Sequence, residues 1–273
     1  MTNPKALLER YDVSPKKSLG QNFLHDPNAL EKIVAVAELM PTDTVVEIGP
    51  GTGALTEVLA QHARHVIAIE LDDRMRPILE GQLARYPNVV LVFDDILKVD
   101  VLHLVGTKDF VVVANVPYYI TSAILRHLLE THRRPRRLVL TMQLEVAERI
   151  VAPVGDLSLL AVSVQFYGKP QIMTRLNPAV FWPRPEVGSA VLRIDTYSQP
   201  PVDVPDADSF FNVVRAGFSQ KRKQLKNSLG SGLHLDNAEA EALIEQAGLD
   251  ARRRAETLSL TEWAALTRVV AAK

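Results

Sequence analysis

The sequence of 273 residues contains no cysteine. This absence excludes disulfide bonds, cysteine-held iron–sulfur clusters, cysteine zinc sites and any mechanism with a thiolate nucleophile. Long apolar runs are also missing. The longest stretch without a charged residue, 110–125, is interrupted by Asn115 and Pro117, whereas a membrane-spanning helix needs about 20 apolar residues. Residues 1–17 lack the apolar centre of a secretory signal. We therefore expect a cytoplasmic protein without a membrane segment.

Neither sign of charge is in excess, since 31 lysines and arginines face 32 aspartates and glutamates. The charges are nevertheless unevenly distributed. Residues 38–109 carry 12 acids and 6 bases, whereas 209–235 carry five bases and no acid. Four of those bases form a cluster in a segment predicted to be helical. We interpret this cluster as a phosphate-binding site rather than as ordinary solvated surface. We predict that they contact the phosphates of a nucleic acid: Lys221, Arg222, Lys223 and Lys226.

Short apolar runs alternate with amphipathic stretches through the first two thirds of the chain. This rhythm predicts an α/β fold with a mostly parallel sheet and helices on both faces. The strands are continuous runs of valine, isoleucine and leucine, as expected when both faces of a sheet are covered. The expected strands are Val45–Ile48, Val66–Leu71, Val89–Phe93, Phe110–Ala114, Leu138–Met142 and Val187–Ile194, with Ile172–Leu176 as a partner of the last.

Prolines concentrate before residue 206, and the segment 196–208 is typical of a linker. We therefore predict a first domain over 1–197 and a small all-helical domain over 198–273. Two capping pairs and two glycines mark the expected helix starts and stops. They are Asp236 with Glu239, Ser259 with Glu262, and the glycines Gly230 and Gly248. The run 133–137, before the fifth strand, is expected to be a solvated loop.

A glycine-rich turn, with Gly49 and Gly51, follows the first of these strands and begins a helix. Such a turn lets the backbone approach a bound nucleotide closely. The next two strands end near Glu70 and Asp95, so that one carboxylate can accept bonds from ribose hydroxyls and the other can meet an adenine edge. Asp72, two residues beyond Glu70, is a further candidate. Because parallel strands end at one edge of a sheet, these groups are expected to share one crevice.

The turn alone leaves the ligand open. Gly49, Gly51 and Ala54 satisfy the dinucleotide fingerprint, so NAD is a competitor, and a turn without any ligand is a third interpretation. Two observations favour S-adenosylmethionine. The turn has the form Glu47-x-Gly-x-Gly-x-Gly that methyltransferases use, and the acidic lobe suits a sulfonium cation.

The fourth strand ends in the tetrapeptide Asn115-Val116-Pro117-Tyr118, which points to the reaction. An exocyclic adenine amine is a poor nucleophile because its lone pair is delocalised into the ring. The amide oxygen of Asn115 and the carbonyl of Pro117 can accept its two N–H groups and direct the lone pair at a methyl group. The ring of Tyr118 can stack on a base that has left its own stack. These residues predict methylation of an adenine N6 amine.

Nearly the whole chain resembles the small-subunit ribosomal RNA adenine dimethyltransferase family of the KsgA type. This is a class I S-adenosylmethionine-dependent methyltransferase fold, Rossmann-like, with a small helical domain behind it. The resemblance includes the glycine turn and the Asn115 tetrapeptide. It rests further on Gly20-Gln21-Asn22-Phe23-Leu24, Phe181-x-Pro183, and Gln220-Lys221-Arg222-Lys223 with Asn227-Ser228-Leu229.

The resemblance implies dimethylation of two adjacent adenosines near the 3′ end of 16S rRNA, in the assembling 30S subunit. It implies that the S-adenosylmethionine site is lined by Asn22, Leu24, Gly49, Glu70, Asp95 and Asn115. It also implies that the target amine is held by Asn115, Pro117 and Tyr118, with Phe181 stacking on the adenine. From the residues alone, Phe181-Trp182 could be a base-stacking platform or a hydrophobic plug at the linker. Leu144 and Leu157-Ser158 depart from the family pattern, which leaves the RNA contacts near them open.

Three rival functions differ in the features they require. A 23S rRNA adenine methyltransferase of the antibiotic-resistance type shares the pocket but is disfavoured by the full C-terminal block. A non-catalytic assembly factor on the same fold is expected to have a damaged tetrapeptide or glycine turn, and both are intact here. A nicotinamide dehydrogenase is the most distant. We expect no metal site, because the histidines lack metal-binding spacing, and we expect a monomer.

Overall fold

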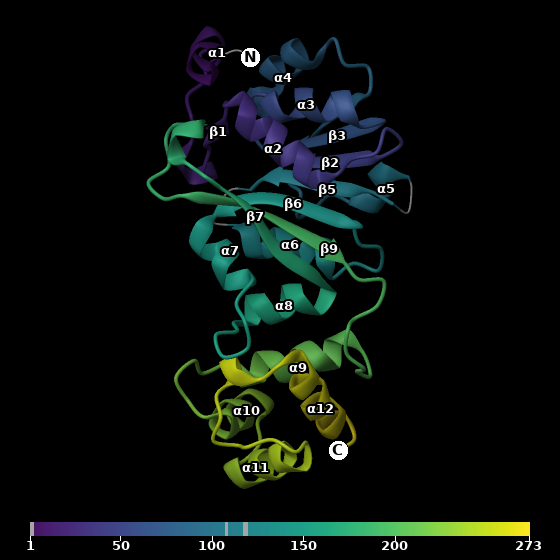
Figure 1. The fold of residues 1–273 in the computed structure, drawn as a ribbon, viewed down its shortest axis with the longest axis vertical. Helices are drawn as coiled ribbons and strands as arrows, with labels where there is room; N and C mark the ends of the chain where they lie inside the picture. The colour runs from purple at the N-terminus through teal and green to yellow at the C-terminus, as the bar shows by residue number, and fades with distance from the viewer. Residues whose placement is uncertain (1–2, 107–108, 117–119) are drawn as a thin grey trace. The chain divides into compact units, whose positions relative to one another are not determined.

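The computed structural model describes residues 3–106, 109–116 and 120–273 (Figure 1). Its main sheet has seven strands in the order β4-β3-β2-β5-β6-β9-β7, and a two-stranded sheet pairs β1 with β8. Strands β2 to β6 run parallel, and β9 runs antiparallel to β6. This confirms the predicted α/β fold. The strands are β1 (Phe23–Leu24), β2 (Thr44–Ile48), β3 (His65–Glu70), β4 (Val89–Phe93), β5 (Val111–Asn115), β6 (Arg137–Gln143), β7 (Gly168–Leu176), β8 (Phe181–Trp182) and β9 (Ser189–Thr196).

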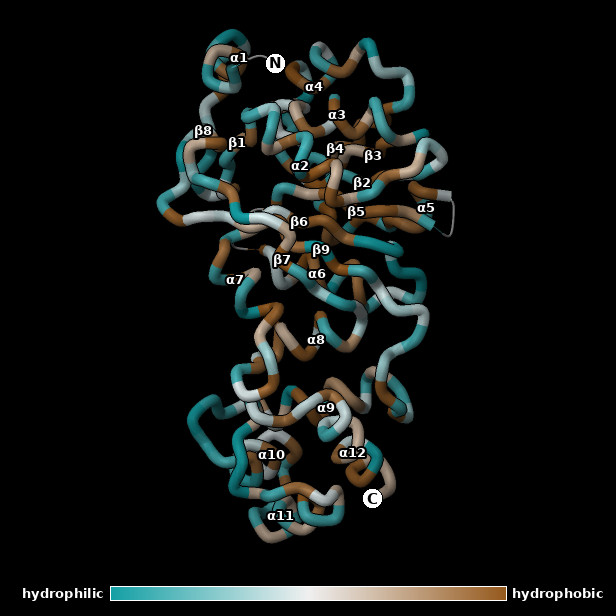
Figure 2. The backbone as a smooth tube through the Cα atoms, viewed as in Figure 1, coloured by the Kyte–Doolittle hydropathy of each residue, from teal (hydrophilic) through white to brown (hydrophobic). Residues whose placement is uncertain are grey.

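The central strands are apolar along their whole length, and β5 shows why they form the middle of the sheet. Its residues Val111 to Ala114 have no exposed surface, and Val45 and Val46 of the neighbouring β2 have none either. Side chains of a strand alternate between the two faces, so burial of consecutive residues requires cover on both faces. Figure 2 shows these strands as hydrophobic segments within the sheet.

Helices cover the sheet on both sides. Parallel strands joined by right-handed crossovers place α3 and α4 on one face and α6 on the other. The helix α2 packs against α3 and β6, and it begins at a proline after the Asp26 cap, whose side chain accepts the Ala29 N–H at 2.8 Å. The helices up to the last central strand are α1 (Pro4–Arg10), α2 (Pro27–Ala37), α3 (Ala54–His62), α4 (Arg76–Leu83), α5 (Val101–Val105) and α6 (Thr121–Leu129).

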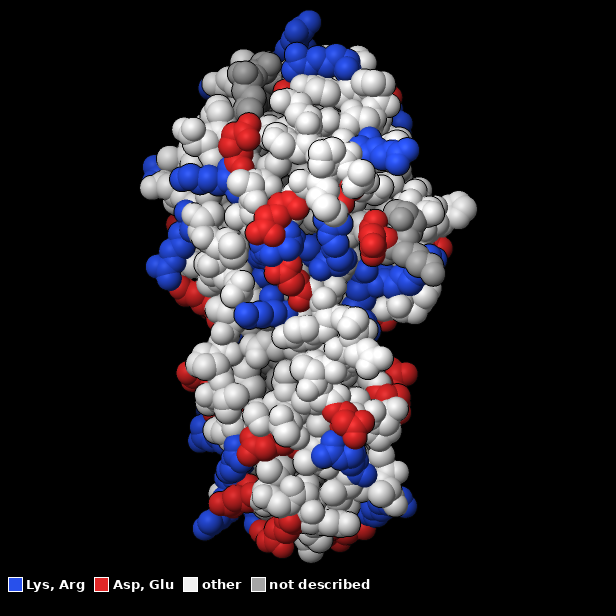
Figure 3. Space-filling model, turned by 45° about the vertical axis from the view of Figure 1, so that its right-hand side comes forward, with Lys and Arg blue, Asp and Glu red and all other residues white. Residues whose placement is uncertain are grey.

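Ion pairs tie the strands together at the edge where β2 and β6 begin. Arg136 donates to both carboxylate oxygens of Asp43 at 2.8 and 2.6 Å. Arg137, the first residue of β6, pairs with Asp195 at 2.6 Å and with Glu38 at 2.9 Å. Acidic and basic side chains also lie next to one another on the face shown in Figure 3. The expectation of a solvated loop over 133–137 is therefore wrong for its last two residues, which have partners distant in sequence.

The chain forms two compact units. The first contains residues 1–147 and 169–196, and the second contains 148–168 and 197–273. The last of these divisions lies after residue 196, and the predicted domain boundary lies after residue 197. The structure additionally groups 148–168 with the C-terminal residues, although the sequence boundary places that segment in the first domain. The chain thus enters the second unit, returns to the first and then enters the second again.

The elements of the second unit are helices, and a cluster of aromatic rings joins α8 to α9. Phe166 stacks on Phe210 with ring centroids 4.4 Å apart, and Phe211 and Tyr167 complete the cluster. This confirms the small helical C-terminal part of the predicted fold. From residue 144 onward, the helices are α7 (Leu144–Ile150), whose start lies in the first unit, α8 (Leu159–Tyr167), α9 (Ala207–Gly217), α10 (Leu225–Leu233), α11 (Asn237–Gln246) and α12 (Leu260–Ala271).

The predicted helix boundaries in this unit are confirmed except at one glycine. Both capping boxes are present, and Gly248 lies just beyond α11 with a φ of +76°. The prediction that Gly230 ends a helix is wrong. It is a buried interior residue of α10, and the helix continues to His234, which adopts the left-handed conformation. None of the helices in the described part of the chain has the length and apolar character that a membrane crossing requires.

Candidate active site

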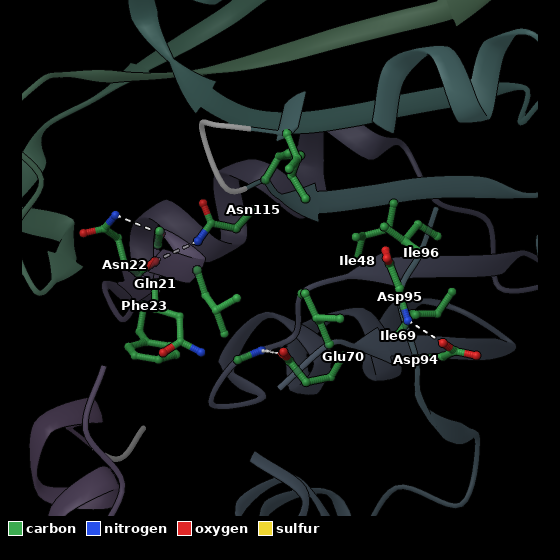
Figure 4. Close-up of a pocket in the computed structure, with 17 residues that line it drawn as sticks. Gln21, Asn22, Phe23, Ile48, Ile69, Glu70, Asp94, Asp95, Ile96 and Asn115 are labelled. Atoms are coloured by element: carbon green, nitrogen blue, oxygen red, sulfur yellow. Dashed lines mark hydrogen bonds between the residues drawn. The ribbon is translucent and has the colours of Figure 1, made fainter. Parts of the chain in front are cut away.

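A pocket opens where the four parallel strands β2, β3, β4 and β5 end (Figure 4). The edge at which the strands of an open α/β sheet end is where small-molecule sites form. Each strand supplies residues at its carboxyl end, and the segment before β1 supplies the rest. The lining residues are Leu19, Gly20, Gln21, Asn22, Phe23, Ile48, Gly49, Gly51, Ile69, Glu70, Leu71, Asp94, Asp95, Ile96, Asn115, Val116 and Ile120.

The glycine turn after β2 is shaped by a ring and a carboxylate. Gly51 has a φ of +55°, and a Cβ added there would lie 2.8 Å from Cδ1 of Phe23. The Gly51 N–H donates to Oε2 of Glu70 at 3.1 Å. Gly49 also has a positive φ, of +71°. Glycine is therefore required at Gly51 both by its conformation and by the close approach of the ring.

Asn115, the last residue of β5, is oriented by the segment before β1. Its Nδ2 donates to the backbone carbonyl of Asn22 at 2.9 Å, and the Asn22 side chain donates to the carbonyl of Gly20 at 3.1 Å. The Asn115 donor group therefore faces Asn22, and its Oδ1 faces the other way (Figure 4). This leaves an acceptor at one end of the pocket, which is what a target N–H group requires.

Carboxylates lie along the rest of the pocket. Glu70 is buried, and its Oε1 accepts the Asp72 N–H at 2.8 Å; burial raises its pKa from the ordinary value. Asp95 lies after β4, and its Oδ1 accepts the Leu97 N–H at 3.0 Å. Asp72, the further ribose candidate, does not line the pocket, because Arg74 and Gln21 hold its carboxylate. The structure therefore favours Glu70 over Asp72 as the carboxylate that meets the ribose hydroxyls.

The pocket fits S-adenosylmethionine better than a pyrophosphate cofactor. Glu70, Asp94 and Asp95 line it, and the lining contains no lysine, arginine or histidine. An anionic pyrophosphate gains nothing from such walls, whereas a sulfonium cation does. Polar groups stand at both ends and near the middle, with apolar side chains such as Ile48 and Ile96 between them (Figure 4).

A second cavity of about 290 Å³ adjoins the glycine turn. It shares Phe23, Gly49, Gly51 and Asn115 with the larger pocket. Leu24, predicted to line the cofactor site, lines this cavity, together with Glu47 from the end of β2. The two spaces together therefore include all seven residues predicted to contact the cofactor: Asn22, Leu24, Gly49, Gly51, Glu70, Asp95 and Asn115.

Comparison with known proteins identifies the family. A model of the ribosomal RNA adenine dimethylase family matches residues 13–271. The chain belongs to this family. Two relatives named ribosomal RNA small subunit methyltransferase A show the extent of the similarity. The one from Dehalococcoides mccartyi (strain CBDB1) is 44% identical over 264 residues, covering 96% of this chain and 91% of the relative. The one from Moorella thermoacetica is 46% identical over 276 residues, covering 97% and 96%.

Solved structures show the same fold. A dimethyladenosine transferase from Plasmodium falciparum superposes with a TM-score of 0.75 at 25% identity, covering 89% of this chain and 95% of that one. The 23S rRNA methyltransferase ErmE superposes with a TM-score of 0.71 at 28% identity, covering 92% and 100%. The predicted class I methyltransferase fold of this adenine dimethylase is thereby confirmed.

One predicted residue, Phe181, lies elsewhere than the family resemblance implies. Phe181, in β8, is only 3% exposed and packs in the apolar core with Leu24 and Leu30. It lines neither cavity, so its ring is not available to a base in this arrangement, and the plug interpretation describes it better. Its stacking role stays a prediction. Pro117 and Tyr118 lie outside the described residues.

The predicted RNA-binding cluster divides into two parts. Residues 221–223 are exposed and lie in the loop between α9 and α10, so their placement on a helix is wrong. Lys226 lies in α10, and its Nζ is 3.0 Å from both carboxylate oxygens of Glu241. A phosphate would have to compete with that carboxylate. The loop therefore supplies the cations available to RNA, and their binding role stays a prediction.

Sequence reasoning missed several residues of the site. Gln21 donates to Asp72 at 2.9 Å and thereby attaches the segment before β1 to the end of β3. Phe23 shapes the glycine turn, and Ile96 forms part of the apolar lining. Each adjoins a predicted site residue: Ile96 follows Asp95, and Gln21 and Phe23 flank Asn22 in the motif on which the resemblance rests. Gln21 and Phe23 come from a segment without periodicity, whose position depends on the pairing of β1 with β8.

Proposed function

We propose that this protein transfers methyl groups from S-adenosylmethionine to the N6 amines of two adjacent adenosines near the 3′ end of 16S rRNA. The substrate is the assembling 30S subunit, and the enzyme acts in the cytoplasm as a monomer. Family membership supports rRNA adenine dimethylation, and the relatives named small subunit methyltransferase A support the choice of subunit. The 30S context, the location and the monomeric state remain predictions.

The oriented amide of Asn115 is the observation that carries the proposal. Its Nδ2 is held by the Asn22 carbonyl at 2.9 Å, so its oxygen is the group presented to a substrate. An oxygen acceptor holds an adenine amine by one N–H and pulls the nitrogen toward tetrahedral geometry, which frees its lone pair. A misoriented amide would present a donor and repel that N–H.

Each of the cofactor-binding residues is expected to contact a different part of the ligand. Glu70 accepts hydrogen bonds from ribose hydroxyls, and Asp95 accepts one from the adenine amine of the cofactor. Asn22, Leu24 and Gly49 surround the amino-acid end. When bound, S-adenosylmethionine supplies an electrophilic methyl group on a sulfonium. The acidic pocket holds this cation, and Asn115 places the acceptor nitrogen in line with it.

No general base is needed for the first step of this mechanism. The amine nitrogen would form its bond to the methyl carbon as the methyl–sulfur bond breaks, with that bond's electron pair left on the sulfur of S-adenosylhomocysteine. The methylated nitrogen would then carry the positive charge and lose its proton readily to water. After one methyl transfer the amine retains one N–H. Of the two expected acceptors, the Asn115 oxygen and the Pro117 carbonyl, one must therefore be satisfied differently in the second transfer.

The test uses labelled S-adenosylmethionine and small subunits from cells that lack this modification. After digestion, the nucleosides are separated, and we expect labelled dimethyladenosine from those subunits. Mature subunits and 23S rRNA serve as controls and are expected to remain unlabelled. Asn115→Ala is the matched variant and is expected to bind cofactor but transfer little label.

Other outcomes identify the alternatives. Label in 23S rRNA would favour the antibiotic-resistance type of enzyme, which the likeness to ErmE keeps as the second candidate. Tight cofactor binding without transfer to any of these RNAs would favour a non-catalytic assembly factor. Either result would overturn the proposal.

A further inference from the structure

Glu47 is a buried carboxyl group with an unsatisfied oxygen. It lies near the end of β2, is 1% exposed, and its Oε2 has no hydrogen-bond partner among the described residues. It lines the cavity of about 290 Å³ beside the glycine turn. A buried polar atom without a partner costs free energy, so it points to a ligand or a function.

The walls around Glu47 provide no positive charge. From β3, the buried carboxyl of Glu70 acts on it as a like charge. From β5 comes the neutral amide of Asn115, from the glycine turn the hydroxyl of Thr52, and from β1 the apolar side chains of Phe23 and Leu24. Thr56 of α3 does not line the cavity, but its hydroxyl acts on Glu47 to lower the pKa of that carboxyl. No lysine, arginine or histidine is among the residues that line it. An ionised Glu47 would therefore be a buried charge without a counter-ion, which is strongly unfavourable.

We propose that Glu47 is protonated while this cavity holds no cation, and that it releases its proton to water when the ammonium group of an amino-acid ligand enters. The inference rests on the proposed function, since S-adenosylmethionine and S-adenosylhomocysteine both carry such a group. The step is balanced: a neutral carboxyl and an ammonium become a carboxylate–ammonium pair, and one proton leaves to solvent. Glu47 is thus a positioning residue for the amino-acid end of the cofactor.

The pKa of Glu47 agrees with its burial and with the lack of a positive charge around it. Burial, with a smaller contribution from the charge of Glu70, raises the pKa of Glu47 to about 8. At pH 7 roughly nine-tenths of the molecules then carry the proton on Glu47. An incoming ammonium favours the charged form and reverses the effect of burial.

The test counts protons during binding. S-adenosylhomocysteine is titrated by calorimetry at pH 7 in buffers of different ionisation enthalpy, and the dependence of the heat on the buffer gives the number of protons released. We expect close to one proton per ligand, and an affinity that rises close to tenfold between pH 6 and pH 7. 5′-Methylthioadenosine, which lacks the amino-acid end, should bind without releasing a proton.

Two variants identify the source of the proton. Glu47→Gln has the same shape and cannot ionise, so the release and the pH dependence should disappear. Glu31→Gln changes an exposed carboxyl on α2 and should behave as the unaltered protein does. Release that persists in Glu47→Gln, or binding of S-adenosylhomocysteine to the unaltered protein without release, would overturn the inference. Absence of any binding would instead overturn the proposed function.

Discussion

Replacing Gly51 by alanine should damage the site by an amount that can be estimated. Its φ of +55° is left-handed, and an alanine there is strained by about 1–2 kcal/mol. The added Cβ would also lie 2.8 Å from Cδ1 of Phe23. The ring is 6% exposed and packed among other side chains, so displacing it costs about 1–3 kcal/mol more. The free energy of unfolding of the first unit should therefore fall by about 2–5 kcal/mol.

Gly106→Ala provides the matched control. Gly106 has nearly the same conformation, with a φ of +56°, but a Cβ there meets no atom of the described residues within 4 Å. Urea unfolding should show the loss of about 1–2 kcal/mol from strain alone. Titration with S-adenosylhomocysteine should show weaker binding only for Gly51→Ala, because only there does the Phe23 wall of the pocket move. Equal losses of stability and unchanged binding in both variants would refute this account of the turn.

Three further predictions concern other parts of the molecule. Asn115→Ala should lower methyl transfer about 100- to 1,000-fold, as loss of one oriented acceptor does, with modest weakening of cofactor binding; unchanged turnover in single-turnover assays would contradict its role. Alanine at all three basic residues 221–223 should reduce the salt dependence of RNA binding, measured by filter binding, whereas Lys226→Ala should change it little. The Arg136 guanidinium lowers the pKa of Asp43, so the stabilisation is present above the ordinary pKa of that carboxyl and is lost as pH falls through the lowered value. Unfolding of Asp43→Asn and the unaltered protein should therefore converge in acid, and a constant difference down to pH 2 would count against the pair.

The sheet could be predicted because its signal is local. Each central strand is a continuous apolar run, and alternation with amphipathic helices leaves few topologies open. The error at Gly230 has a different cause. A Cβ there would approach the carbonyl of Leu235 to 3.1 Å, so this glycine serves close packing inside the unit rather than a helix end. Local sequence cannot distinguish these two uses of glycine.

The site was predictable where residues follow a strand. Gly49, Glu70, Asp95 and Asn115 each come directly at a strand end, and parallel strands bring such ends together. Arg137, in contrast, forms an ion pair with Asp195. This pair could not be predicted, because no feature of the sequence near Arg137 indicates a partner so far along the chain.

The division of the second unit between two stretches of chain has a consequence for biosynthesis. Residues 148–168 leave the ribosome first, and Phe166 then has to await Phe210, against which it stacks. Domains generally fold as units as they emerge. Until residue 210 has emerged, the ring of Phe166 in α8 therefore lacks the partner on which it stacks, so this helix cannot complete its packing while the first unit is already whole.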